Sequence, residues 1–109
     1  MQANYLHRLT SILVFVDEQL HEELHLEELA KLAHYSPYHL HRLFKAVTGE
    51  TLQSYIQRKR LEKAILLLIH EPQLPIIDIG MRCGYPSNSS FSRAFKQFTG
   101  KSPANYRKQ

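Results

Sequence analysis

Apolar residues recur along most of the chain at intervals of three and four, the spacing that places them on one face of an α-helix. The first such stripe runs from Tyr5 to Leu20. No stretch alternates apolar and polar residues at a period of two, so we expect no β-strand. The pattern predicts an all-α fold class with seven helices, within about residues 5–20, 26–33, 36–49, 52–71, 75–84, 87–100 and 102–106.

Several of these segments carry residues that typically begin or end a helix. Ser36 precedes Pro37, so we expect the serine to cap a helix whose first residue is the proline. That helix should end at Gly49, because glycine readily adopts the left-handed conformation found after a helix. Ser87 and Gly100 delimit a later segment in the same way. The short connections between segments are typical of one compact helical domain.

An internal repeat is the strongest signal in the sequence. Residues 42–49 (RLFKAVTG) match residues 93–100 (RAFKQFTG) at a shift of 51. Upstream the shift is 50, since Tyr35 falls on Tyr85, so the second copy has one additional residue in its turn. Each copy is predicted to form a helix, a tight turn and a second helix. We expect one domain over residues 1–109, with helix-turn-helix subdomains at about 5–50 and 75–107 and a long linking helix at about 52–71.

The second helix of each repeated unit has one apolar and one polar stripe. The residues expected to be buried are Leu40, Leu43, Phe44 and Val47 in the first unit, and Phe91, Ala94, Phe95 and Phe98 in the second. The polar stripes consist of Tyr38, His41, Arg42 and Lys45, and of Ser89, Ser92, Arg93 and Lys96, with Asn88 at the tip of the second helix. The two polar stripes correspond position by position at the shift of 51.

Such a polar stripe suits a helix that lies in the major groove of DNA. Arginine pairs with the O6 and N7 atoms of guanine, asparagine pairs with adenine, and serine or histidine bonds to several base edges. Tyr38 can contact a thymine methyl group or a phosphate, and the lysines one turn further along can reach the DNA backbone. One such stripe alone would be explained by a solvated helix face. The same basic pair in both units favours DNA binding.

Charge is distributed unevenly along the chain. The net charge is +4 and the isoelectric point about 9.3, but residues 1–41 carry a charge of −4 and residues 42–109 a charge of +8. An unevenly charged, solvated surface is one explanation, and a polyanionic partner is the other. The linking helix contains a basic run that either contacts the DNA backbone or forms a solvated face, namely Arg58, Lys59, Arg60 and Lys63. Arg60 could instead pair with a carboxylate inside the domain.

The composition argues against an enzyme, a metal site and a membrane protein. The seven histidines show no paired-ligand spacing, and the single cysteine, Cys83, aligns with Ala33 in the repeat and is expected to be a small buried residue. No glycine-rich phosphate loop or nucleophile–base arrangement is present. The longest apolar run, residues 64–69, is far shorter than the ~20 residues that cross a bilayer. We therefore expect no catalytic residue, metal ion or cofactor, no membrane contact, and a cytoplasmic location.

Three stretches of the second half of the chain form a recognisable pattern: residues 76–85 (IIDIGMRCGY), residues 87–107, and residues 55–68 of the linking helix. In these stretches the chain resembles the AraC/XylS family of bacterial transcriptional regulators. Residues 26–49 resemble the first helix-turn-helix unit of the same family. The resemblance implies seven helices, with the fourth holding two helix-turn-helix subdomains apart. It also implies recognition helices that enter successive major grooves, about one turn (~34 Å) apart.

The resemblance also implies partners and a site. Family members usually activate transcription by contacting RNA polymerase, often with an effector-responsive second domain. Here that domain would be missing, as in a stand-alone regulator, or would follow residue 109. The implied base contacts are Tyr38, His41 and Arg42 in the first unit, and Asn88, Ser89, Ser92 and Arg93 in the second. We expect phosphate contacts from Ser36, Lys45, Arg58, Lys59, Ser87, Ser90 and Lys96.

Three residues depart from the family pattern. His34 stands where glycine is common, so the first turn requires either a strained left-handed residue or a different geometry. Gly80 stands where alanine is usual and suggests a close helix crossing, and Pro86 lengthens the second turn. Two other functions stay open: a sequence-neutral architectural DNA-binding protein, and a protein–protein adaptor that does not bind DNA.

Overall fold

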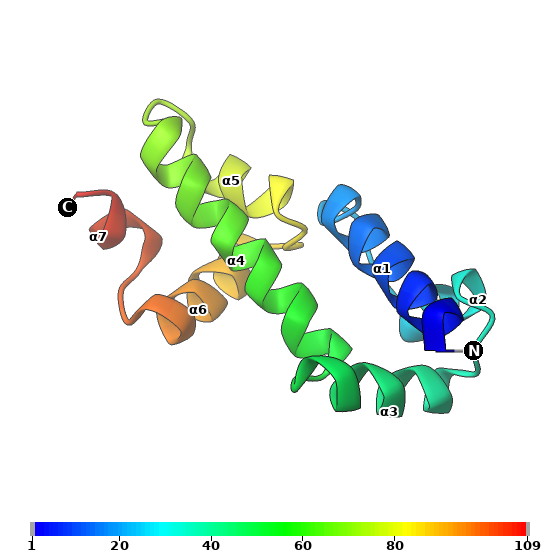
Figure 1. The fold of residues 1–109 in the computed structure, drawn as a ribbon. Helices are drawn as coiled ribbons and strands as arrows, with labels where there is room; N and C mark the ends of the chain where they lie inside the picture. Colours follow the sequence, from blue (N-terminus) through cyan, green and yellow to red (C-terminus); the bar gives the residue numbers. More distant parts are fainter. Residues whose placement is uncertain (1, 109) are drawn as a thin grey trace. The chain divides into compact units, whose positions relative to one another are not determined.

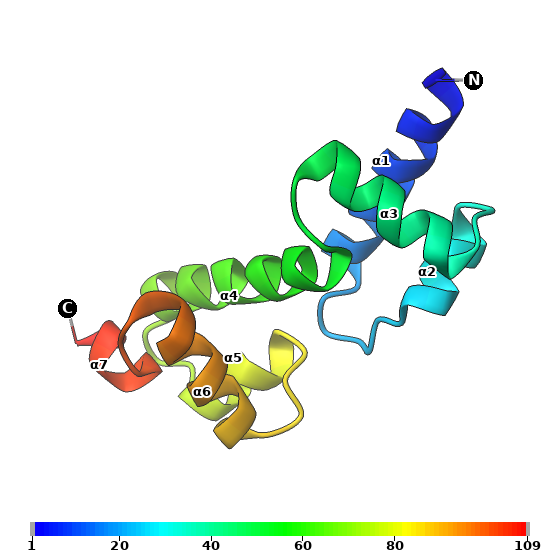
Figure 2. The same cartoon turned by 90° about the horizontal axis from the view of Figure 1, so that it is seen from below.

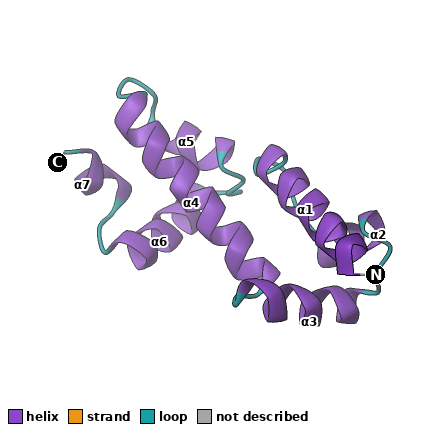
Figure 3. Ribbon diagram, viewed as in Figure 1, coloured by secondary structure: helices purple, strands orange, loops and turns teal. Residues whose placement is uncertain are grey.

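The computed structural model describes residues 2–108, with side chains from residue 6 onward, so Tyr5 of the first apolar stripe lies outside the described side chains. Every regular element in this part of the chain is a helix (Figures 1 and 3), which confirms the predicted all-α fold class. The helices of residues 2–108 are α1 (Gln2–Glu18), α2 (Leu26–Leu32), α3 (Pro37–Thr48), α4 (Leu52–His70), α5 (Ile76–Arg82), α6 (Asn88–Thr99) and α7 (Pro103–Arg107).

The helix ends follow the residues that were expected to set them. The hydroxyl of Ser36 accepts a hydrogen bond from the backbone N–H of His39 at 3.1 Å, so it caps α3 ahead of the proline. Gly49 and Gly100 follow α3 and α6 with φ angles of 85° and 87°. Other ends differ from the expected ranges by one to three residues. The structure has α1 at Gln2–Glu18, α2 ends at Leu32 and α4 ends at His70. The α5 helix begins after Pro75 and ends at Arg82, and α7 continues through Arg107.

The chain divides into two compact units, residues 1–57 and residues 58–109, with the boundary inside α4. In the first unit α2 packs against α3, and in the second α5 packs against α6 (Figures 1 and 2). The first core is formed by Leu9, Ile12, Val16, Leu20, Leu29, Ala30, Ala33, Leu40, Phe44, Leu52 and Ile56. The second core is formed by Leu61, Ala64, Leu68, Ile79, Cys83, Phe91 and Phe95.

The two units repeat each other over a longer span than the two helix-turn-helix motifs. At a shift of 52, Arg8 and Leu9 of α1 fall on Arg60 and Leu61 of α4, and Val16 falls on Leu68. The equivalent leucines and the Val16–Leu68 pair are buried in the cores of their own units. The second half of α4 is therefore the counterpart of α1, and both precede a helix-turn-helix motif.

The burial expected at two positions is wrong. Val47 and Phe98 lie on the apolar stripes of α3 and α6, but they are 48% and 45% exposed. Both residues lie in the last turn of their helix, beyond Phe44 and Phe95, which are fully buried. The stripe continues along the helix for one more turn than the core beneath it. Cys83, by contrast, is fully buried as predicted.

The two tight turns follow the same backbone path as far as Tyr35 and Tyr85, despite their different residues. His34 has a φ of 60° and Gly84 a φ of 94°, so both adopt the left-handed conformation. The next residue in each turn, Tyr35 or Tyr85, donates its backbone N–H to a carbonyl of the preceding helix at 2.9 Å or 3.0 Å. The strained alternative expected for His34 is therefore confirmed. The second turn is one residue longer, as the shift in the repeat indicated.

Gly80 marks a close crossing between α5 and α6. A Cβ atom at this position would lie 2.8 Å from the Cγ and Cδ2 atoms of Phe91 and 3.0 Å from its Cβ atom. Real Cβ atoms essentially never approach another carbon so closely. Glycine at this position therefore allows the two helices of the second unit to pack around a phenylalanine.

Candidate nucleic-acid interface

The polar stripe of α3 lies on the surface of the first unit. Tyr38, His41, Arg42 and Lys45 are all exposed, and the exposed fraction of Tyr38 reaches 70%. Nη1 of Arg42 donates a hydrogen bond to the hydroxyl oxygen of Tyr38 at 3.3 Å. The guanidinium carbon of Arg42 also lies 5.7 Å from the centre of the tyrosine ring, within the range of a cation–π contact.

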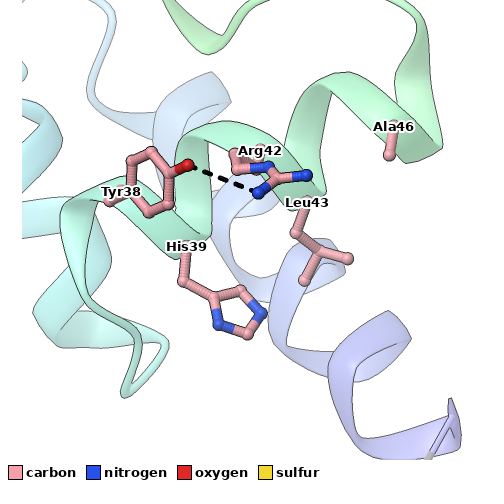
Figure 4. Close-up of a pocket in the computed structure, with 5 residues that line it drawn as sticks. All are labelled: Tyr38, His39, Arg42, Leu43 and Ala46. Atoms are coloured by element: carbon pink, nitrogen blue, oxygen red, sulfur yellow. Dashed lines mark hydrogen bonds between the residues drawn. The ribbon is translucent and has the colours of Figure 1, made fainter.

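A shallow hollow of about 340 Å³ borders this pair of side chains (Figure 4). The imidazole of His39 stands at one side of the hollow and stacks on the ring of Tyr35, with 5.0 Å between ring centres. The guanidinium of Arg8 lies 5.1 Å from the same tyrosine ring. The hollow is lined by Tyr38, His39, Arg42, Leu43 and Ala46, all from α3.

The corresponding surface of α6 has a different composition. Asn88, Ser89, Arg93 and Lys96 are exposed, and Ser92 is half-buried. Arg93 makes no side-chain hydrogen bond or ion pair with any residue whose side chain the structure describes. Because Ser89 replaces the tyrosine of the first unit, no aromatic ring lies four residues before this arginine.

The first turns of α3 and α6 are suited to an anionic ligand. The Ser87 hydroxyl accepts the backbone N–H of Ser90 at 3.1 Å, and the Ser90 hydroxyl accepts the backbone N–H of Ser87 at 3.4 Å. Neither helix has an acidic residue in its first turn, whereas α2 and α5 both have one or two. The positive end of the helix dipole is thus not neutralised by a carboxylate at the start of either recognition helix.

The basic run of α4 makes contacts inside the protein. Arg58 donates to Glu62 at 3.1 Å, and Lys59 lies 3.9 Å from the same carboxylate. Lys63 donates to the backbone carbonyl of Arg82 at 3.1 Å. Surface ion pairs of this kind contribute only about 0–1 kcal/mol, so a phosphate can compete for Arg58 and Lys59. Phosphate contacts from Arg58 and Lys59 stay a prediction, in which DNA would take the place of Glu62.

Arg60 differs from the other basic residues of this run. It is half-buried beside Tyr85 and Cys83, and its burial lowers the pKa of its guanidinium. Burial also raises the pKa of the Tyr85 phenol and raises that of the Cys83 thiol to about 11. This environment favours a structural role for Arg60 within the second unit, where its charge interacts with Tyr85.

Among the residues that the structure describes, no three histidine, cysteine or acidic side chains gather where they could hold a metal ion. Within the same residues, no helix combines the length and the apolar character needed to span a bilayer.

Comparison with known proteins identifies the family to which the chain belongs. A sequence model of the helix-turn-helix domain matches residues 29–109. The regulatory protein SoxS of Escherichia coli K12 is 36% identical over 96 residues, which span 88% of this chain and 89% of SoxS. The chain belongs to the AraC/XylS family of transcriptional regulators. The resemblance found in the sequence is thereby confirmed.

Other relatives support the same assignment. The right origin-binding protein of Escherichia coli K12 is 37% identical over 97 residues, which span 89% of this chain but only 33% of that protein. The DNA-binding domain of AdpA, solved in complex with a target DNA, superposes with a TM-score of 0.87 at 29% identity and covers 92% of this chain and 89% of its own. An AraC-type regulator from Chromobacterium violaceum gives a TM-score of 0.85 at 28% identity, over 98% and 95% of the two chains.

The structure thus places the predicted base-contacting residues of each AraC/XylS-type unit on one helix face. It brings Tyr38 and Arg42 into direct contact, whereas the sequence indicates them only as individual base contacts. Their spacing of four residues on a helix was the available signal for this pairing. The hollow that Leu43 and Ala46 line was not expected, because Leu43 was assigned to the apolar stripe and Ala46 to neither stripe.

Proposed function

We propose that this protein binds specific double-stranded DNA sequences and regulates transcription, with α3 and α6 each reading a major groove. The observation that carries the proposal is the recurrence of an exposed arginine–lysine pair on both helices. Arg42 and Lys45 of α3 correspond to Arg93 and Lys96 of α6, and all four side chains are exposed. Membership of a family of transcriptional regulators supports the same function.

In this proposal the two kinds of contact come from different parts of each recognition helix. The N-terminal part of such a helix usually reaches base edges, and residues further along reach the backbone. The base contacts fall on Tyr38, His41, Arg42, Asn88, Ser89, Ser92 and Arg93. The phosphate contacts fall on Ser36, Lys45, Arg58, Lys59, Ser87, Ser90 and Lys96.

The capping serines contribute to phosphate binding mainly through the backbone. The hydroxyls of Ser36 and Ser87 already accept hydrogen bonds from backbone N–H groups of their own helices. A phosphate that approaches the start of α3 or α6 would therefore meet the remaining unpaired N–H groups of the first turn. We expect replacement of either serine to weaken DNA binding indirectly, by loosening the first turn.

The rival function is a DNA-binding protein without sequence preference. Selection of bound duplexes from a random library, followed by footprinting of the selected sequence, separates the two. A regulator should prefer its operator by ~10³ or more over random duplex at a stated salt concentration. A ratio near one would establish the neutral binder instead, and no salt-dependent binding to any duplex would favour a protein–protein adaptor.

The family also suggests what acts beside the DNA-binding surface. We propose that the protein acts in the bacterial cytoplasm, activates transcription by contacting RNA polymerase, and works with an effector-responsive domain on the same or another chain. Transcription in vitro with purified RNA polymerase tests the contact with the polymerase. An activator should raise transcript levels, whereas an operator-bound protein that only blocks the promoter would lower them. As a member of this family, the protein is not expected to catalyse a reaction.

A further inference from the structure

We propose that Tyr38 is a positioning residue that holds Arg42 in the orientation needed to contact one base pair. As a result, Arg42 should discriminate between base pairs more strongly than Arg93 does. The inference rests on the proposed function, because it concerns how the same recognition helix selects its sequence. It differs from the expectation that Tyr38 acts chiefly through its own contact with a base.

The geometry of the pair carries the first step. The hydroxyl oxygen of Tyr38 accepts a hydrogen bond from Nη1 of Arg42 at 3.3 Å, and the guanidinium carbon lies 5.7 Å from the ring centre. Figure 4 shows the two side chains turned toward each other along the outer face of α3. A guanidinium has five N–H donors, and this hydrogen bond uses one of them. The remaining donors can still form a bidentate pair with O6 and N7 of guanine.

The position of the pair on the helix carries the second step. Side chains on a helix lean toward its N-terminus, so a residue at position i+4 lies over the residue at position i. The contact with Tyr38 therefore holds the arginine toward the N-terminal half of α3, the part of a recognition helix that usually reaches base edges. Tyr38 is 70% exposed, so the pair forms on the surface that would face DNA and not in the core.

Side-chain entropy carries the third step. A free arginine samples many rotamers and loses this freedom when it binds a base, whereas tyrosine has two side-chain torsions. An arginine that is already held in one orientation loses less freedom on binding, and it is less able to turn toward a wrong base pair. Ordering a long side chain at an interface typically changes affinity by roughly two- to tenfold.

The second unit provides an internal comparison. Arg93 occupies the position equivalent to Arg42, but Ser89 replaces the tyrosine, and no side-chain hydrogen bond to Arg93 is found among residues 6–108. Of the two equivalent arginines, Arg42 is thus held by a tyrosine and Arg93 is not. The sequence preference should accordingly be sharper at the base pair read by Arg42 than at the one read by Arg93.

The test measures base discrimination with the whole chain on its selected operator. The two arginine-dependent base pairs are first located as the positions where Arg42→Ala or Arg93→Ala removes the preference. Binding to the preferred and substituted base pairs is then compared for the wild type, Tyr38→Phe, Arg42→Ala and the double variant. Tyr38→Phe retains the ring and removes only the hydroxyl, so it should lower the discrimination at the Arg42 base pair about threefold.

A positioning role makes specific demands on the other measurements. Discrimination at the Arg93 base pair should not change in Tyr38→Phe, and the substitution should have no further effect once Arg42 is alanine. The reciprocal variant Ser89→Tyr should sharpen discrimination at the Arg93 base pair. Far-ultraviolet circular dichroism of each variant checks that α3 and α6 remain folded.

Three results would overturn the inference. Tyr38→Phe could leave discrimination unchanged, or it could lower affinity equally on all sequences, which would make Tyr38 a phosphate contact. Tyr38→Phe could also have the same effect in the Arg42→Ala background, which would mean that the Tyr38 hydroxyl acts by contacting a base itself and not through Arg42. Failure of the proposed function gives a different result, because the wild-type protein itself would then show no preference at any base pair.

Discussion

Replacement of Gly80 by alanine tests how closely α5 and α6 approach each other. Helix propensity alone predicts that alanine would stabilise α5 by about 1 kcal/mol. The structure predicts the opposite sign, because the added Cβ would lie 2.8 Å from the ring of Phe91, whose side chain is fully buried. The close atoms include the Cβ of Phe91, so the phenylalanine cannot relieve the clash by turning its ring alone.

The magnitude follows from these two opposing effects. Overpacking of a well-packed core typically costs about 1–3 kcal/mol, since side chains or helices must shift to restore ordinary contact distances. Subtracting the gain in helix propensity leaves an expected loss of about 1 kcal/mol in the free energy of unfolding. The sign, and not only the size, therefore distinguishes a close crossing from an ordinary helix position.

The first unit supplies the matched control. Ala30 and Leu40 occupy the positions equivalent to Gly80 and Phe91, and both are fully buried. Compared with the second unit, the first unit thus has a larger residue on α2, Ala30 in place of glycine, and a smaller one on α3, Leu40 in place of phenylalanine. The double variant Gly80→Ala/Phe91→Leu copies this combination into the second unit. It should recover most of the stability lost in Gly80→Ala, with an interaction free energy of about 1–2 kcal/mol between the two sites.

Urea unfolding of the wild type, both single variants and the double variant measures these differences. The midpoint and the slope are compared together, because a change in slope would indicate that the two units no longer unfold as before. If Gly80→Ala raised the free energy of unfolding by about 1 kcal/mol, and Phe91→Leu acted independently of it, the close approach of α5 and α6 would be wrong.

Three further predictions concern the turns, the recognition helix and the buried thiol. Thermal unfolding should show that His34→Gly stabilises the protein by about 0.5 kcal/mol and that Gly84→Ala destabilises it by about 1–2 kcal/mol. The reason is that both positions have a left-handed backbone conformation, which favours glycine. Equal effects of the same sign would refute this. Arg93→Ala should cost about 1–3 kcal/mol mainly at one base pair, whereas Lys96→Ala should weaken binding evenly and lower the salt slope by about one; the reverse pattern would exchange the two roles. The Cys83 thiol, with its pKa raised to about 11, should resist alkylation at neutral pH. Its contribution to stability should be fully present below pH 9 and decline as the pH rises toward 11, as alkali-induced unfolding would show, and rapid labelling of the folded protein at pH 7 would contradict this.

The fold was predictable from sequence where local chemistry decides it. The limits of α3 follow from Ser36 and Gly49, because capping and the left-handed conformation depend on a few neighbouring residues. The burial of Val47 and Phe98 was mispredicted, since periodicity identifies the face of a helix but not how far the core extends beneath it. The extent of a core depends on residues distant in sequence.

The candidate site was predicted residue by residue, but not as an arrangement. Amino-acid type and helical spacing were sufficient to select Arg42 and Arg93 as equivalent residues. They were not sufficient to show that Arg42 contacts Tyr38, because this contact depends on the rotamers of both side chains. The sequence does show that Arg93 has serine in place of that tyrosine. The role of Arg60 was likewise open until its position beside Tyr85 was known, since the sequence shows only its place in a basic run.

The residues that differ between the two units lie mainly at positions where either residue is compatible with the shared fold. The turn keeps a left-handed residue whether that residue is His34 or Gly84, and the crossing keeps its combined volume by different residue pairs. On the reading surface, the arginine and lysine are common to both helices, whereas Tyr38 and His41 are replaced by serines in the second unit. If the shared lysines position each helix on DNA, the residues that differ around the common arginine can give the two helices different sequence preferences. One chain would then carry two recognition helices with different sequence preferences, built on one repeated structural unit. Such a chain can recognise an asymmetric operator without a second copy.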